Sequence, residues 1–180
     1  MAEFLRQLLG YFIVKQILMN LDFTIRQANV ADVPQIFSLI KALAEYEKLS
    51  HQVTGTIEQL QEHLFGSRIY AEAIITEIND KIVGFALFIP NYSTFLTKPG
   101  IYLEDLFVLP EYRRQGIGKA MLSYLGRLAI ERDAGRLEWS VLDWNESAIA
   151  FYQSIGAKVL PDWRICRVTD NALEALATIY

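Results

Sequence analysis

The chain has 180 residues, which is the length of one compact domain or of one domain with a short appendage. Hydrophobic residues make up 52% of the chain and charged residues 21%, which excludes a disordered or collagen-like protein. The net charge of −4, from 17 basic and 21 acidic residues, disfavours a protein that coats nucleic acid. We therefore expect no nucleic-acid partner, and any bound anion must be held by a local site.

The chain contains a single cysteine, Cys166, so no intrachain disulfide can form, and a reducing cytoplasm is the expected compartment. The two histidines, His51 and His63, do not combine with Cys166 in any common zinc-ligand spacing, so no metal is expected. No uncharged apolar run reaches 18 residues, and no membrane span is expected.

Residues 1–22 form an apolar extension before the first expected strand. Two interpretations of this extension remain open. In the first interpretation it forms an amphipathic helix. In the second it is a non-native start, and the native chain begins at Met19. We therefore divide the chain into the extension, residues 1–22, and one domain, residues 23–180.

The first half of the domain begins with an alternating stretch, Phe23–Ala28, that predicts a strand. Asp32 is in a position to cap a helix whose apolar residues recur at intervals of three and four. Thr56 and Gln59 form a capping-box pattern for a second helix, which Gly66 can end.

Two β-rich runs follow, Tyr70–Ile78 and Lys81–Ile89, and the Asn79–Asp80 pair between them predicts a hairpin turn. The polar stretch Asn91–Gly100 is interpreted as a loop. It leads into a further expected strand, Ile101–Leu109, which Pro110 ends.

The second half predicts a helix over residues 116–133, a strand over 136–142, a short helix over 146–154 and a last strand over 163–169. These elements predict one α/β domain. Its central mixed, mostly antiparallel sheet is flanked by helices and contains a β-α-β unit.

The most informative stretch is residues 108–119, where a strand ends at a proline and two glycines, Gly116 and Gly118, open a helix. Glycines let backbone N–H groups approach a ligand closely, and a helix N-terminus favours phosphate. Three cations lie in the same stretch: Arg113, Arg114 and Lys119. The pattern therefore indicates a polyphosphate site in a protein that is acidic overall.

Two common phosphate motifs do not match this stretch. A Walker A loop requires glycine where Arg113 stands and Ser or Thr where Ala120 stands. A dinucleotide fingerprint requires a small residue where Met121 stands. What remains is the pattern Arg-x-x-Gly-x-Gly between a strand and a helix.

This pattern resembles the pyrophosphate-binding loop of the GNAT acyl-CoA N-acetyltransferases, and the resemblance covers about residues 23–169. Further segments resemble the diamine (spermidine/spermine) and thialysine acetyltransferases of that superfamily: residues 39–47, 102–108, 144–152 and 163–164. The resemblance implies a GNAT-like domain with a β-α-β acyl-CoA-binding core. It also implies acetyl-CoA as cosubstrate, no metal, and direct transfer to a primary amine in a ternary complex.

The resemblance further assigns residues to the acyl-CoA site: Leu106, Phe107, Val108, Arg113, Arg114, Gln115, Gly116, Ile117, Gly118, Lys119, Asn145, Ser147 and Tyr152. It assigns Tyr152 the role of general acid toward the departing thiolate. Glu104 matches a glutamate that removes the proton of the amine, directly or through water. Strand alternation predicts that Glu104 and its neighbour Asp105 lie on opposite faces.

The amine site implied by the resemblance contains Tyr46, Glu47, Glu104 and Asp162. The stretch 91–100 departs from the polyamine-selective relatives, since it lacks their acidic residue and tryptophan and carries Lys98. A smaller amine or an amino-acid side chain therefore fits as well as a polyamine.

Two alternatives stay open at this point: an enzyme that acetylates protein N-termini or lysines, and a catalytically idle CoA-binding module. The presence of both Glu104 and Tyr152 favours an active enzyme. The resemblance and the high apolar fraction also lead us to expect a homodimer.

Overall fold

The computed structural model describes residues 22–179, so the predictions for residues 1–21 fall outside the described chain. The described residues divide into two compact units, residues 22–140 and residues 141–179. Each unit is described by itself.

The first unit is built on a five-stranded sheet. Its strands, in spatial and in chain order, are β1 (Thr24–Gln27), β2 (Glu72–Ile78), β3 (Lys81–Ser93), β4 (Lys98–Val108) and β5 (Leu137–Trp139). Neighbouring strands from β1 to β4 pair antiparallel, and β4 pairs with β5 in parallel. The predicted mixed, mostly antiparallel sheet is therefore confirmed.

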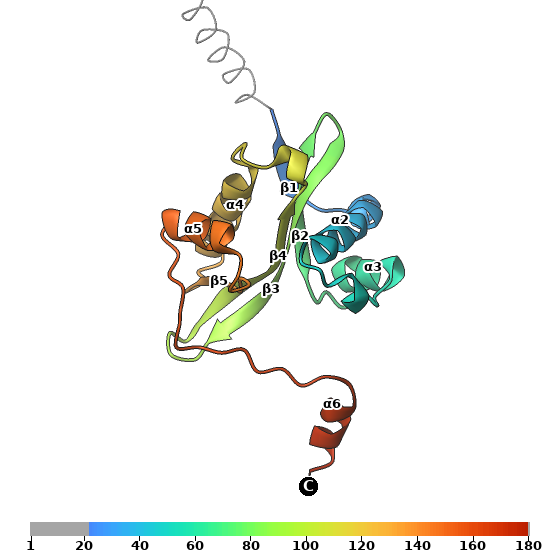
Figure 1. Ribbon diagram of the computed structural model, residues 1–180, viewed down its shortest axis with the longest axis vertical. Coiled ribbons are helices and arrows are strands. Elements are labelled where there is room, and N and C mark those ends of the chain that lie inside the picture. Colours follow the sequence, from blue (N-terminus) through green and yellow to red (C-terminus); the bar gives the residue numbers. More distant parts are fainter. Residues whose placement is uncertain (1–21, 180) are drawn as a thin grey trace, which may run out of the picture. The chain divides into compact units, whose positions relative to one another are not determined.

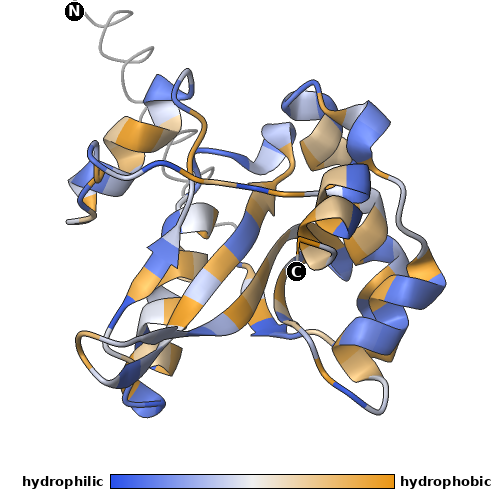
Figure 2. Cartoon of the chain, turned by 90° about the horizontal axis from the view of Figure 1, so that it is seen from below, coloured by the Kyte–Doolittle hydropathy of each residue, from blue (hydrophilic) through white to orange (hydrophobic). Residues whose placement is uncertain are grey.

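Helices cover both faces of this sheet (Figure 1). The helices α2 (Val33–Tyr46) and α3 (Ile57–Phe65) lie on one face, and α4 (Ile117–Glu131), which connects β4 to β5, lies on the other. Three short 3-10 helices join these elements: η1 (Val30–Asp32), η2 (Ser50–Gln52) and η3 (Pro110–Tyr112). Hydrophobic residues are prominent along the strands (Figure 2).

The two faces of the sheet have separate apolar cores. Residues buried together on the α2 and α3 face include Val33, Ile36, Leu39, Leu64, Ala73, Ile75, Phe85 and Phe107. The buried residues of α4 are Ile117, Met121, Leu122, Leu125, Leu128 and Ala129. Their spacing of three and four is the helical period that the sequence predicts.

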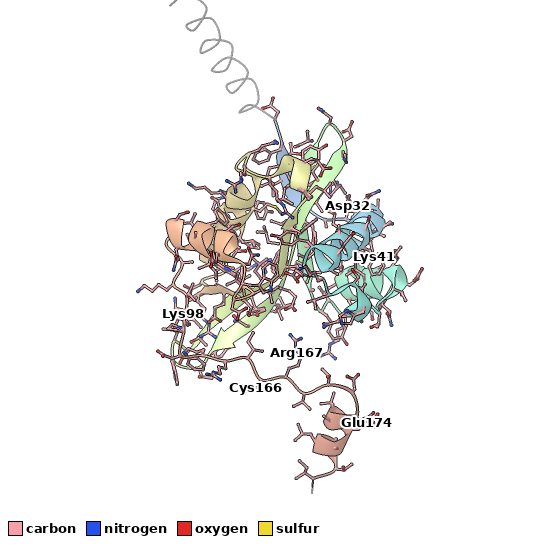
Figure 3. All side chains as sticks on the ribbon, in the orientation of Figure 1. Asp32, Lys41, Lys98, Cys166, Arg167 and Glu174 are labelled. Atoms are coloured by element: carbon pink, nitrogen blue, oxygen red, sulfur yellow. The ribbon has the colours of Figure 1, made fainter. Side chains whose placement is uncertain are left out.

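The start of α2 differs from the prediction in its chemistry. Asp32 occupies the N-cap position of α2, but its side chain makes no capping hydrogen bond to that helix. Its carboxylate instead accepts two hydrogen bonds from the Arg26 guanidinium, at 2.7 and 2.9 Å, and one from the Asn29 amide at 2.7 Å. Figure 3 labels Asp32 at this end of the helix. A buried carboxylate forms a stronger interaction with a guanidinium than with one backbone amide.

Two predicted local structures are confirmed. The Thr56 hydroxyl accepts from the Gln59 amide at 3.2 Å, and the Gln59 side chain accepts from the Thr56 amide at 3.0 Å. The hairpin between β2 and β3 turns at Asn79 and Asp80, whose φ angles are +48° and +61°. Asparagine and aspartate tolerate this left-handed conformation, so the turn forms without glycine.

The predicted loop over residues 91–100 is wrong. β3 continues to Ser93 and β4 begins at Lys98, so only residues 94–97 form the turn. The side-chain amide of Asn91 donates to the Glu138 carboxylate at 2.8 Å, which anchors this long hairpin to β5. Polar residues therefore continue the ladder because they bond across the sheet.

The second unit contains α5 (Glu146–Ser154), which is confirmed, and α6 (Asp170–Ala177), which was not predicted. The predicted strand over residues 163–169 is wrong, since this segment has no helix or strand assignment. Residues 141–179 contain no strand with which it could form a ladder. The predicted strand over 136–142 is shorter in the structure and ends at Trp139.

Candidate active site

A β-bulge interrupts β4 at Glu104. Leu87 of β3 lies opposite Asp105, and the next residue, Phe88, lies opposite Leu103, so Glu104 has no partner in the β3–β4 ladder. Leu103 and Asp105, which regular alternation would place on one face, therefore lie on opposite faces of the sheet. The placement of Glu104 and Asp105 on opposite faces stays a prediction. Bulges are frequent beside active sites because they redirect side chains and end regular pairing.

The bulge also changes which edge of β4 each amide faces. Ile101 donates its amide hydrogen to the Arg136 carbonyl at 3.1 Å, on the β5 side. Leu109 donates to the Val83 carbonyl at 2.9 Å, on the β3 side. Residues separated by an even number of positions in a regular strand face the same edge. The amides of Ile101 and Leu109, eight positions apart, nevertheless face opposite edges, because the bulge adds one residue at Glu104.

It follows that the N–H groups of Leu106 and Val108 face the β5 edge. The β4–β5 ladder pairs Leu103 with Trp139 and includes no later residue of β4 in the described chain. Beyond that point these backbone groups are directed to an edge of β4 that β5 does not cover. An extended ligand chain can pair with such an edge as a strand would.

The loop between β4 and α4 has the conformation that its glycines predict. Gly116 is the N-cap of α4 and has a φ of +84°, and Arg114 has a φ of +61°. A Cβ atom at Gly118 would lie 3.8 Å from Leu106 Cδ2, which is ordinary contact. The Ile117 side chain is buried, so only its backbone can contact a ligand. The first-turn amides of α4 have no acceptor within the helix, and backbone groups of this kind can bind an anion.

The three cations of this loop are not equivalent. Arg114 and Lys119 are exposed, and neither makes a hydrogen bond or ion pair within residues 22–179. Arg113 is half-buried, and its Nε donates to the Val108 carbonyl at 2.8 Å. Its guanidinium lies 4.5 Å from the ring centroid of Tyr46. The Gln115 side chain donates to the Glu111 carbonyl at 3.4 Å.

Three carboxylates lie close together at the bulge and the end of α2. Burial raises the pKa of Asp105 to about 6, and the charges of Glu104 and Glu47 act in the same direction. Burial also raises the pKa of Glu47, which is the C-cap of α2. Because Leu87, opposite Asp105, packs on the α2 and α3 core, Asp105 lies on that face of the sheet.

Asp105 was not predicted to be a site residue. A buried carboxyl with a raised pKa beside two other carboxylates is a candidate for a functional site. The sequence signal was the pair Glu104–Asp105 itself, which regular alternation would separate. Only the register with β3 reveals the bulge at Glu104.

Four predicted site residues lie in the second unit, which is described by itself. Tyr152 is half-buried on α5, with its ring 5.4 Å from that of Phe151. Asn145 is the N-cap of α5, and its side-chain oxygen accepts from the Ala148 amide at 3.3 Å. Ser147 and Asp162 are exposed. Their assigned roles stay predictions.

Residues 22–179 contain neither a metal-ligand cluster nor a membrane-spanning helix. No group of three His, Cys, Asp or Glu side chains is arranged to hold a metal ion. None of the helices combines the length and the apolar character needed to cross a membrane.

A strand interrupted by a bulge, followed by a glycine-opened helix with free cations and a parallel strand, defines an acyl-CoA-type acetyltransferase site. The model of the Acetyltransferase (GNAT) family matches residues 37–157. The chain therefore belongs to this family and is an acetyl-transferring enzyme. Members of the family use acetyl-CoA as cosubstrate.

Two curated relatives align over most of the chain. The thialysine N-epsilon-acetyltransferase of Bos taurus is 37% identical, covering 85% of this chain and 96% of that protein. The L-ornithine N5-acetyltransferase NATA1 of Arabidopsis thaliana is 34% identical, covering 84% of this chain and 86% of that protein.

Among solved structures, the integron cassette protein VCH_CASS6 of V. cholerae matches with a TM-score of 0.72 and 25% identity. The match covers 87% of this chain and 98% of that one. The GNAT fold and the suspected diamine and thialysine acetyltransferase type are thus confirmed.

Proposed function

We propose that this enzyme transfers the acetyl group of acetyl-CoA to a primary amine of a small molecule, such as a diamine, polyamine, thialysine or similar compound. The bulge at Glu104 carries the proposal. It turns the backbone N–H groups of Leu106 and Val108 to the β5 edge of β4. It lies at Glu104, whose charge acts on the neighbouring Asp105. The likeness to acetyltransferases named for thialysine and ornithine supports a small amine substrate.

Acetyl-CoA would supply the acetyl group as a thioester. The first-turn amides of α4, with Arg114 and Lys119, have the charge and geometry to hold its phosphates. The N–H of Leu106 or Val108, on the edge of β4 beyond its pairing with β5, would stabilise the negative charge that develops on the carbonyl oxygen. Asn145 and Ser147 are further proposed cosubstrate contacts.

The amine would bind at the carboxylates of Glu47, Glu104 and Asp105, whose combined charge attracts an ammonium group. Tyr46 and Asp162 are further proposed substrate contacts. A primary ammonium has a pKa of about 10.4 and must lose a proton before it attacks. Glu104 accepts that proton, directly or through water, and the free amine then attacks the acetyl carbonyl.

Tyr152 would protonate the departing thiolate. A phenol, with an ordinary pKa of about 10, can donate to a thiolate whose acid has a pKa of about 8.5. General acid–base assistance of this kind accelerates reactions by roughly 10²–10⁴-fold.

An acetylation screen read by thiol release tests the proposal. The screen would compare diamines, polyamines, thialysine, L-ornithine, amino acids and lysine peptides at equal acetyl-CoA concentration. We expect the highest kcat/KM with small molecules that carry a second positive charge. A preference for lysine peptides, or no transfer to any amine, would overturn the proposal.

Initial-rate kinetics test direct transfer in a ternary complex. We expect intersecting patterns, and we expect Cys166→Ala to stay active because Cys166 lies outside the matched motifs. Parallel, ping-pong patterns with loss of activity in Cys166→Ala would instead indicate an acetyl-cysteine intermediate.

We further propose that the enzyme is a cytoplasmic homodimer. The proposed dimer rests on the family resemblance and on the high apolar fraction of the chain, 52%. Light scattering at micromolar concentration tests the dimer, and a monomer mass would refute it. The single cysteine supports the reducing compartment.

A further inference from the structure

Arg113 joins three elements of the first unit. Its Nε donates to the Val108 carbonyl of β4 at 2.8 Å. Its guanidinium carbon lies 4.5 Å from the ring centroid of Tyr46 on α2 and 5.2 Å from that of Phe107 on β4. The residue itself begins the loop that opens α4. One side chain thus connects the loop between β4 and α4, here called the phosphate loop, to Tyr46, the last residue of α2.

The neighbouring cations have no such contacts. Arg114 and Lys119 are exposed and make no hydrogen bond or ion pair with any described residue. They can therefore turn to a phosphate at no cost in protein contacts. Arg113 would have to give up a hydrogen bond and two ring contacts to do so.

Arg113 contacts the end of α2 that lies beside the carboxylates of Glu47, Glu104 and Asp105. Tyr46 is followed directly by Glu47, whose charge contributes to the raised pKa of Asp105. A displacement of the Tyr46 ring would therefore change where the Glu47 carboxylate lies. The planar guanidinium suits this contact because it stacks on aromatic rings, which an ammonium does less well.

We propose that Arg113 is a positioning residue that couples the phosphate loop to the amine-binding end of α2 and does not itself bind phosphate. The inference rests on the proposed function, since it assigns amine binding to the Tyr46–Glu47 end. Through Arg113, the conformation of the loop at Gly116 sets the position of Tyr46 and Glu47. Loss of Arg113 therefore acts on the amine and not chiefly on acetyl-CoA.

Steady-state kinetics with thialysine and acetyl-CoA test the inference on Arg113→Lys, Arg113→Gln and the matched control Arg114→Gln. Arg113→Lys keeps the charge but loses the planar stack and the Nε bond. We expect both Arg113 variants to raise KM for thialysine by roughly five- to tenfold, with a smaller change in KM for acetyl-CoA. Arg114→Gln should do the reverse, because it removes a phosphate-facing charge.

A double-mutant cycle with Tyr46→Leu adds a second measurement. The effects of Arg113→Gln and Tyr46→Leu on KM for thialysine should be strongly non-additive, whereas those of Arg114→Gln and Tyr46→Leu should add. Thermal unfolding checks that each variant is folded. If neither Arg113 variant folds, the Tyr46→Leu variant alone tests the inference. An unchanged KM for thialysine in that variant overturns it.

A phosphate-binding role predicts a different pattern. Arg113→Lys would then behave like the unmodified enzyme toward both substrates, and Arg113→Gln would raise KM for acetyl-CoA as Arg114→Gln does. Either result overturns the inference while the enzyme still acetylates thialysine. Absence of transfer to any amine in the unmodified enzyme would instead refute the proposed function.

Discussion

Gly118 on α4 and Leu106 on β4 approach each other so that a Cβ at Gly118 would lie 3.8 Å from Leu106 Cδ2. The protein itself therefore leaves room for an alanine at this position. If glycine is needed here, the reason is a ligand that must approach the backbone. A substitution can thus separate ligand approach from protein packing.

Gly118→Ala is expected to fold normally and to bind CoA at least about tenfold more weakly, because the methyl group blocks the helix start from phosphate. Gly118→Asp should bind still more weakly, since it adds negative charge. Gly126→Ala is the matched control, because a Cβ there meets nothing within 4 Å and CoA affinity should not change. Calorimetry measures the affinities. Unchanged binding in folded Gly118→Ala would contradict the proposed phosphate site.

Asp105→Asn is expected to stabilise the protein above pH 6. The folded-state pKa of Asp105 is raised to about 6 from an ordinary 3.8, so its ionisation opposes folding, fully so above pH 6. The gain should be on the order of 1–3 kcal/mol at pH 8 and should vanish near pH 4. Urea unfolding measures it, with Asp80→Asn in the β2–β3 turn as control. A gain that is independent of pH would contradict the assignment.

The same titration affects the amine. Below about pH 6 the Asp105 carboxyl gains a proton, so KM for a cationic amine should rise as the pH falls through this value. In Asp105→Asn the KM for the amine should be higher at every pH, and the stepwise rise in KM near pH 6 should be absent. If the step persists in the variant, another group is responsible for it.

Tyr152→Phe and Glu104→Gln should affect opposite sides of the reaction. Tyr152→Phe should lower kcat by roughly 10²–10⁴-fold with acetyl-CoA affinity nearly unchanged. Glu104→Gln should weaken binding of a cationic amine and move the acidic limb of the pH–rate profile upward. This shift is expected because more free amine must come from solution. Stopped-flow and steady-state rates measure both effects.

These two roles fail separately. A Tyr152→Phe enzyme that keeps more than about a third of kcat, with chemistry rate-limiting, would leave Tyr152 without the acid role. A pH–rate profile unaltered by Glu104→Gln would leave Glu104 as a structural carboxylate.

Asp32→Asn should destabilise the protein by about 2 kcal/mol, because it removes the charge that pairs with Arg26 beside the core. Arg26 lowers the pKa of Asp32, so this contribution is present above about pH 4 and is lost as the pH falls further. Asp133→Asn is the control. Its ion pair with Lys98 is largely exposed and should contribute no more than about 0.5 kcal/mol. Equal losses in the two variants would contradict this account.

The sequence predicted elements best where local signals agree. The bounds of α5 match the prediction, residue for residue, because Asn145 caps the helix and Gly156 follows it. The β2–β3 hairpin also formed as predicted, from its Asn79–Asp80 turn. In both cases the determinants lie within a few residues of the element that they define.

Other features depended on distant partners. The bulge at Glu104 is defined by pairing with Leu87 and Phe88, so alternation within β4 alone could not reveal it. Likewise, Arg113 matched the phosphate motif by position, yet one of its two ring contacts is with the distant Tyr46 of α2. A strand over residues 163–169 was predicted, but residues 141–179 contain no strand that could pair with it.

The bulge also constrains how this strand can change in evolution or in engineering. Inserting or deleting one residue between Leu103 and Leu106 would exchange the two faces for everything that follows, moving Phe107 out of the α2 core. Length variation among relatives should therefore be absent there and should gather at the hairpin tip, residues 94–97, where Phe95 is 95% exposed. Grafting a tag or a reporter into this enzyme should accordingly succeed at Phe95 and fail at Glu104.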